Sequence, residues 1–236
     1  MAHDGAQKAR GMNLSVNAPR LVMFDLDGTL VETAPEICDA VNDTLTHFAL
    51  APVAQQQVND WIGHGTHTLL VQALAWSQGQ TEAAVRASAA LADIAAVFKT
   101  HYAQRCGTRS HPYADVVQTL ERLRQRGAHL AVVTNKESAY TQTVLDAHGL
   151  TPFFGSVICG DTFATKKPAP EGVLACLAQF GVAAADALFV GDSSIDVATA
   201  RNAGVPVWAV PYGYNMGQPI AACGPDRIIA TIGAIE

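Results

Sequence analysis

Two aspartates beside a glycine are the residues whose types and spacing most strongly suggest chemistry in this sequence. Asp25 and Asp27 stand two positions apart after the apolar run 20–24, in the stretch FDLDGTL. Alternate side chains of an extended chain point to the same side, so both carboxylates can face one site. Close carboxylates repel each other and need a proton or a cation between them. The stretch therefore predicts a cation-dependent site at the end of a buried strand.

Polar residues follow three further apolar runs, which we predict to be strands at 129–133, 156–159 and 187–190. The side chains concerned are Thr134 and Asn135 after the first run, Lys166 and Lys167 after the second, and Asp192 and Asp196 after the third. Taken singly, each group has a plainer interpretation as a turn, a solvated loop or a helix N-terminus. Since the carboxyl ends of parallel strands share one edge of a sheet, we expect all of them to converge.

The elements between these runs predict an α/β fold. Amphipathic helices are expected at 115–126, 138–148, 170–180 and 195–203, and two more strands at 207–210 and 227–230. Strands that alternate with helices form βαβ units, whose right-handed crossovers place helices on both faces of a parallel sheet. The prediction is a doubly wound parallel sheet.

Residues 33–107 predict only helices, starting near 37, 58 and 64, with one long alanine-rich helix that follows Thr81 as its cap. Thr33 is expected to cap the first helix. A segment of this length, directly after a catalytic strand, is too long to be a simple loop. We therefore expect a helical cap domain at 33–107, inserted into a catalytic core at 20–32 and 108–236, after a flexible leader at 1–19.

The composition limits which partners the protein is expected to bind and in which compartment it is expected to work. The formal net charge is −6, and only 15% of residues are charged, with no basic block. Nucleic acid and anionic membranes are therefore not expected partners. The five cysteines are scattered without a C-x-x-C pair, and no apolar run approaches the roughly 20 residues of a membrane span. We expect a cytoplasmic protein with reduced thiols, either a monomer or a homodimer.

The D-x-D-G-T-L stretch resembles the first motif of the haloacid dehalogenase-type phosphatases. The K-P-x-P pattern that begins at Lys167 and the G-D-S-x-x-D pattern at residues 191–196 are similar to later motifs of that family. The resemblance implies that Asp25 is the nucleophile and Asp27 the general acid/base. It also implies Mg²⁺ as cofactor, held by Asp25, Asp192 and the backbone carbonyl of Asp27, with Asp196 behind these ligands.

The same resemblance assigns substrate contacts. Thr134 and Lys167 are expected to hold phosphoryl oxygens, together with the N–H groups of Leu26 and Asp27. Gly28 and Asn135 complete the substrate-binding residues expected in the core. Ile195 stands where many relatives have Asn, which leaves one hydrogen bond near the metal undefined.

The stretch WIGHG at residues 61–65 resembles a motif of the bacterial phosphoglycolate phosphatases, as do PYGYN at 211–215 and the later Pro225-Asp226. This resemblance implies 2-phosphoglycolate as the substrate, with its carboxylate near Gly63, His64 and Gly65. Glu32 and His64 depart from the residues usual in that family.

There are four alternative functions. A sugar phosphomutase similar to beta-phosphoglucomutase would share the core motifs and differ in the cap, and another small phosphate ester is an equally simple substrate. A haloacid dehalogenase would lack the second aspartate, Asp27. A phosphorylated receiver module is about half as long and has no D-x-D-G-T.

Overall fold

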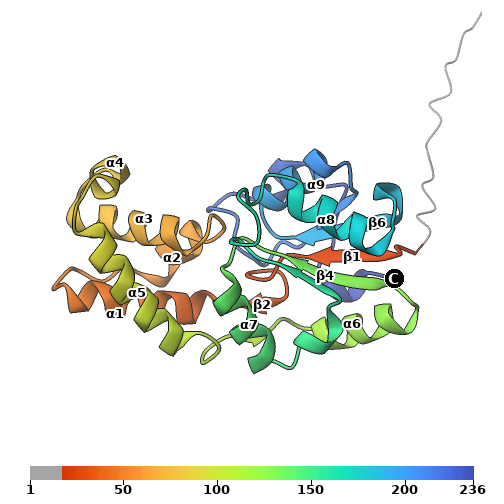
Figure 1. The fold of residues 1–236 in the computed structure, drawn as a ribbon, viewed down its shortest axis with the longest axis horizontal. Helices are drawn as coiled ribbons and strands as arrows, with labels where there is room; N and C mark the ends of the chain where they lie inside the picture. Colours follow the sequence, from red (N-terminus) through yellow and green to blue (C-terminus); the bar gives the residue numbers. More distant parts are fainter. Residues whose placement is uncertain (1–17) are drawn as a thin grey trace, which may run out of the picture.

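The computed structural model describes residues 18–236, so most of the leader expected at 1–19 lies outside the described residues. Its main feature is a six-stranded parallel sheet in the order β5-β4-β1-β6-β7-β8 (Figure 1). The strands are β1 (Leu21–Phe24), β4 (His129–Val133), β5 (Ser156–Ile158), β6 (Ala187–Gly191), β7 (Val207–Ala209) and β8 (Arg227–Ile228). All six predicted strands are present.

The sheet is covered on both faces, as the side chains of β1 show. Val22 and Phe24 belong to one hydrophobic cluster, whereas Leu21 and Met23 belong to another, because successive side chains of a strand point to opposite faces. In Figure 1, α6 (Val116–Gln125) and α7 (Ser138–Ala147) lie on one side of the sheet, and α8 (Glu171–Phe180) and α9 (Ser194–Ala203) lie on the other. The predicted doubly wound α/β fold is confirmed.

The order of the strands places a crevice beside β1. The chain continues from β1 to β4 and β5 on one side of it, and then to β6, β7 and β8 on the other. Such a reversal opens a crevice at the carboxyl ends of the strands, where open α/β sheets bind ligands. The polar residues after β1, β4 and β6 therefore start from neighbouring strand ends.

Between the two parts of the core lies a group of helices, which we call the helical insertion (residues 33–107). It contains α1 (Ala34–His47), α2 (Gln55–Trp61), α3 (Thr66–Gln78), α4 (Glu82–Arg86) and α5 (Leu91–Arg105). In Figure 1 these helices lie beside the sheet, away from α6 and α8. Two short antiparallel strands, β2 (Val31–Glu32) and β3 (His111–Pro112), pair where the chain leaves and re-enters the core. No helix within residues 18–236 has the length and apolar character to cross a bilayer.

Two details of the insertion differ from the sequence-based expectation. The single helix expected after Thr81 is two, α4 and α5, although the Thr81 hydroxyl does accept from the N–H of Ala84 at 3.2 Å. At the break the Ser88 hydroxyl accepts from the N–H of Ala90, a local bond that competes with helix. Thr33 stands at the start of α1, but its hydroxyl donates to Asp27 Oδ1 at 2.6 Å instead of capping the helix.

Candidate active site

Asp25 lies at the carboxyl end of β1 and is buried, with 8% of its surface exposed. Its N–H is fixed by the carbonyl of Val190 at 3.0 Å, which extends the pairing of β1 with β6. Lys167 Nζ lies 2.8 Å from Asp25 Oδ1 as an ion pair, yet this oxygen receives no well-directed hydrogen bond from residues 18–236. A buried carboxylate oxygen left in this state is suited to binding a further positive group.

Asp196 is held by the start of α9, and the local sequence explains why. Ser193 caps the helix by accepting from the N–H of Asp196, while Asp196 Oδ2 accepts from the N–H of Ser193 at 3.0 Å. The other oxygen, Oδ1, accepts from Lys167 Nζ at 2.7 Å. Because both oxygens of Asp196 already have partners, Asp196 orients Lys167 and the loop before α9.

Asp192 is oriented by residues far away in the chain. The Thr29 hydroxyl donates to Oδ1 at 2.6 Å, and the N–H of Tyr214 donates to Oδ2. The loop that contains Gly28 runs against the carboxylate, since a Cβ on Gly28 would lie 2.4 Å from Asp192 Oδ2. Gly28 also has a φ of +86°, which favours glycine. Its contribution in the structure is close packing against Asp192.

We expect Gly28→Ala to lower the free energy of unfolding by about 3 kcal/mol or more, since it adds a steric clash to backbone strain. Gly79→Ala is the matched control: its φ is +64°, but a Cβ there meets nothing within 4 Å. That variant should lose only about 1–2 kcal/mol. Urea unfolding of both variants measures the difference, and equal losses would refute the close packing of Gly28 against Asp192.

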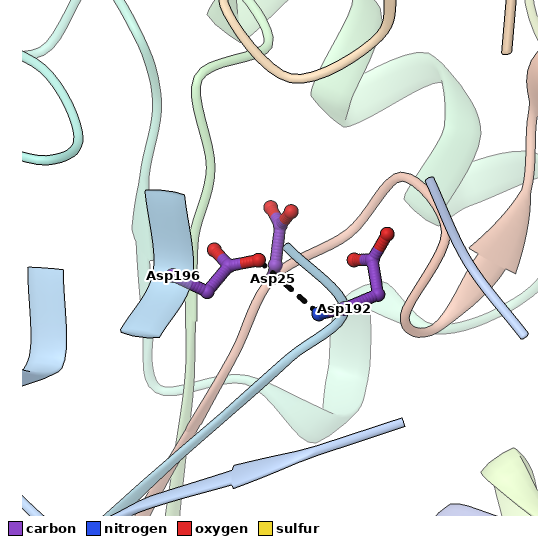
Figure 2. Close-up of side chains that lie close together, drawn as sticks. All are labelled: Asp25, Asp192 and Asp196. Carbon is purple, nitrogen blue, oxygen red and sulfur yellow. Dashed lines mark hydrogen bonds between the residues drawn. The ribbon is translucent and has the colours of Figure 1, made fainter. Parts of the chain in front are cut away.

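Asp25, Asp192 and Asp196 together form an acidic cluster, drawn in Figure 2, with one oxygen of each within 4.8 Å of the others. Burial raises the pKa of Asp25 to about 7, with Lys167 opposing the shift. Burial, followed by the charges of Asp196 and Asp25, also raises the pKa of Asp192. The surroundings therefore do not fully stabilise the negative charge that the cluster carries when its carboxyl groups are ionised.

A hard divalent cation fits this cluster. Asp25 and Asp192 offer the carboxylate oxygens that such ions prefer, within reach of each other. When all are ionised, the four aspartates of the site exceed its two buried lysines, Lys136 and Lys167, by two charges. One divalent cation would balance that excess.

Thr134 and Asn135 lie at the end of β4, next to Asp25, and both are buried. Thr134 Oγ1 accepts from the N–H of Lys136 at 3.2 Å, so its own hydrogen remains available for a phosphoryl oxygen. Asn135 Nδ2 instead donates to the carbonyls of Gly63 and Lys167, at 2.9 and 3.0 Å. Asn135 thus joins the core to the helical insertion.

The loop between α2 and α3 meets the core at the same place. Besides the bond from Asn135 to Gly63, Lys166 Nζ donates to the carbonyl of His64 at 2.6 Å, and the Thr66 hydroxyl donates to Glu137 Oε1 at 2.6 Å. The exposed Lys166 is therefore a contact to the insertion, whereas the buried Lys167 lies among the carboxylates. The choice of Lys167 for the site agrees with this placement.

A small cavity lies where the insertion meets the strand ends. Its lining includes Asp25 and Asp27 from the predicted catalytic residues, Asp192 from the predicted metal ligands, Thr134 and Asn135 just after β4, and Gly63 and Gly65 from the insertion. His64 and Lys167 are not part of the lining, and the side chain of Leu26 is fully buried. The cavity lies between the core and the insertion and is partly open to solvent.

Four further side chains belong to the site but were not predicted. They are Thr29 and Tyr214, which hold Asp192 or the start of α1, and Lys136 and Tyr102, which lie beside Asp27. Thr29 and Tyr214 lie inside the DGTL and GYN stretches. They could have been predicted by including every residue of these two stretches in the site. Nothing in the sequence indicates that Lys136 is buried.

The comparisons with known proteins agree with this geometry. Residues 22–210 match the family model described as haloacid dehalogenase-like hydrolase. The phosphoglycolate phosphatase of Aliivibrio fischeri is 40% identical over 89% of this chain and 91% of its own, and that of Vibrio parahaemolyticus 36% identical over 92% and 94%.

Among solved structures, the crystal structure of a predicted phosphoglycolate phosphatase from Haemophilus somnus superposes with a TM-score of 0.87 and 32% identity, over 93% of this chain and 97% of that one. The family-model match and the identity to curated relatives over most of the chain establish the family. The chain therefore belongs to the haloacid dehalogenase-like hydrolases and, within them, to the phosphoglycolate phosphatase family.

Proposed function

We propose that this protein hydrolyses 2-phosphoglycolate to glycolate and phosphate, using Mg²⁺ and a phosphorylated Asp25. The observation that carries this proposal is the convergence of Asp25, Asp27 and Thr134 on one cavity, with Lys167 paired to Asp25. Membership of the family implies a phosphatase activity, and the chemistry of these residues supports a mechanism for it. The substrate is proposed from the relatives and from the small size of the cavity.

The mechanism divides one difficult displacement into two easier ones. A carboxylate oxygen of Asp25 attacks phosphorus while the bond to the ester oxygen breaks, and Asp27 gives its proton to the departing alkoxide. Asp27 then takes a proton from the water that attacks the aspartyl-phosphate, which releases phosphate, restores the Asp25 carboxylate and leaves Asp27 protonated again. The Thr134 hydroxyl and the Lys167 ammonium stabilise charge on the phosphoryl oxygens.

Mg²⁺ would be held by Asp25, Asp192 and the backbone carbonyl of Asp27, and when bound it screens the repulsion between a carboxylate nucleophile and an anionic ester. The carboxylates of Asp25 and Asp192 fit this ion. Asp196 would act behind the ligands through Lys167 and the loop 192–193.

We further propose that the helical insertion acts as a cap. Gly63 and Gly65 line the cavity opposite the strand ends, and the hydrogen bonds from Asn135 and Lys166 close the insertion over it. Closure excludes water and lets the insertion select the substrate. A small ester such as 2-phosphoglycolate leaves room for closure, with its carboxylate near the backbone of residues 63–65, whereas a nucleotide would hold the cap open.

The compartment and assembly are also part of the proposal. All five cysteines are free thiols in the structure, which suits a reducing compartment. We expect a cytoplasmic enzyme, monomeric or homodimeric, that acts without nucleic acid or membrane.

Phosphate release from a panel of esters, measured before and after chelation, tests the proposal. We expect no turnover in the chelated enzyme and recovery on addition of Mg²⁺. We also expect kcat/KM for 2-phosphoglycolate to exceed that for hexose phosphates and nucleoside monophosphates by at least about tenfold, which requires about 1.4 kcal/mol of differential transition-state binding.

Each alternative gives a different result in the same assay. Full activity after exhaustive chelation would refute the metal requirement. Equal, slow hydrolysis of every ester would refute substrate selection by the insertion. Interconversion of hexose 1- and 6-phosphates without net phosphate release would instead identify a phosphomutase.

A further inference from the structure

Lys136 is a buried lysine that none of the roles above uses. It follows Thr134 and Asn135 after β4, and its side chain is only 1% exposed. Its backbone is fixed, because its N–H donates to Thr134 Oγ1 and its carbonyl accepts from Gly160 at 2.8 Å. Burying an ammonium group costs free energy unless the group is paired, so the partners of Lys136 indicate its role.

The partners of Lys136 come from both parts of the molecule. Nζ donates to Asp27 Oδ1 at 2.9 Å and also to the hydroxyl of Tyr102, which α5 of the helical insertion contributes. Tyr102 is itself fully buried and packs against Phe98 and Tyr140. Burial alone would lower the pKa of Lys136, but Asp27, Tyr102 and Cys106 together outweigh it, and the pKa lies above its usual range.

These contacts hold the carboxylate of Asp27 through only one of its two oxygens. Lys136 Nζ and the Thr33 hydroxyl both donate to Oδ1, whereas Oδ2 has no hydrogen bond to residues 18–236. Asp27 also lines the cavity. With Oδ1 fixed by two donors, Oδ2 is the oxygen free to exchange a proton with a substrate oxygen or a water molecule.

We propose that Lys136 is a positioning residue for Asp27, and that the Tyr102 hydroxyl links its position to the helical insertion. The inference rests on the proposed function, in which Asp27 protonates the leaving alkoxide and later deprotonates water. Lys136 fixes the carboxylate with Oδ2 toward the cavity, and Tyr102 holds the ammonium group only while α5 is docked on the core. The arrangement ties acid/base catalysis to closure of the insertion.

The test compares two phosphoryl donors that need the acid to different degrees. The alkoxide of 2-phosphoglycolate requires protonation as it leaves, whereas the acetate of acetyl phosphate, an equally small donor, does not. Rapid-quench trapping gives the rate at which Asp25 is phosphorylated by each donor, and the rate at which the phosphoenzyme then hydrolyses.

In Lys136→Met we expect phosphorylation by 2-phosphoglycolate and hydrolysis of the phosphoenzyme to slow by about 10²-fold, the lower end of the usual contribution of a general acid or base. Phosphorylation by acetyl phosphate and the Kd for 2-phosphoglycolate should stay within about threefold. Tyr102→Phe keeps the ring and should show the same pattern at about three- to tenfold. Lys99→Met on the exposed side of α5 and Tyr140→Phe in the same aromatic cluster are the matched controls, and neither should change these rates.

Two results would overturn the positioning role. A weaker Kd for 2-phosphoglycolate with unchanged phosphorylation rates would make Lys136 an anchor for the substrate carboxylate. Equal slowing with both donors would make it a structural residue. If Lys136→Met does not fold, Tyr102→Phe decides by the same comparison. Failure of the wild-type protein to form phosphoenzyme from either donor would instead refute the proposed function.

Discussion

Asp25→Asn is expected to lower turnover of every phosphate ester by at least about 10⁴-fold, as losing a nucleophile does in other covalent enzymes. An amide oxygen is a poor nucleophile, and Asn also offers the metal a weaker ligand. The fold should persist, because burial raises the pKa of Asp25 and a neutral amide removes that cost. Thermal unfolding of the metal-free variant checks that the lost activity is not lost structure.

The phosphoenzyme separates loss of the nucleophile from loss of metal. Acid-quenched Asp25→Asn should contain no acyl phosphate at any Mg²⁺ concentration. Asp27→Asn is the matched control, since Asp27 sits two residues away and lines the same cavity. It should still be phosphorylated by acetyl phosphate and then hydrolyse slowly. Trapped intermediate in the Asp25 variant would contradict the assignment of the nucleophile.

The sequence predicted those parts of the site that depend on strand ends. Asp25, Thr134 and Asp192 each follow an apolar run, and parallel pairing of β1, β4 and β6 brings those runs together. Asp196 was placed correctly near them because the S-x-x-D pattern of Ser193 and Asp196 is a helix start as well as a family motif. Periodicity and helix-start chemistry act locally, so they can be inferred without the fold.

The parts that sequence reasoning missed depend on contacts between distant segments. Tyr102 and Lys136 meet only because α5 packs against the core, and neither residue stands in a pattern that indicates burial. The Thr33 hydroxyl was expected to cap α1, but Asp27 lies close enough to accept its hydrogen bond. Short strands such as β2 and β3, with two residues each, carry no periodicity from which to predict them.

Lys167→Met is expected to lower the free energy of unfolding by about 3–5 kcal/mol at pH 8 in chelator, because it leaves buried carboxylates without their counter-charge. Nζ contacts Asp25 at 2.8 Å and Asp196 at 2.7 Å, and its side chain is 3% exposed. The neighbouring Lys166→Met is the matched control, since Lys166 is exposed and donates to the carbonyl of His64. That variant should lose well under 1 kcal/mol.

The pH dependence gives this prediction a second readout. The folded-state pKa of Asp25 is raised by burial from 3.8 to about 7, so the folded protein binds its proton more tightly than the unfolded chain does. Stability of the metal-free protein should therefore fall as the pH rises from about 4 to 7. Lys167 opposes that shift, so its removal should raise the pKa of Asp25 further and extend the fall above pH 7. Urea unfolding at pH 5 and pH 8 measures both effects. A Lys167→Met variant that matches Lys166→Met at both pH values would show that the Lys167 ion pairs do not stabilise the carboxylate cluster.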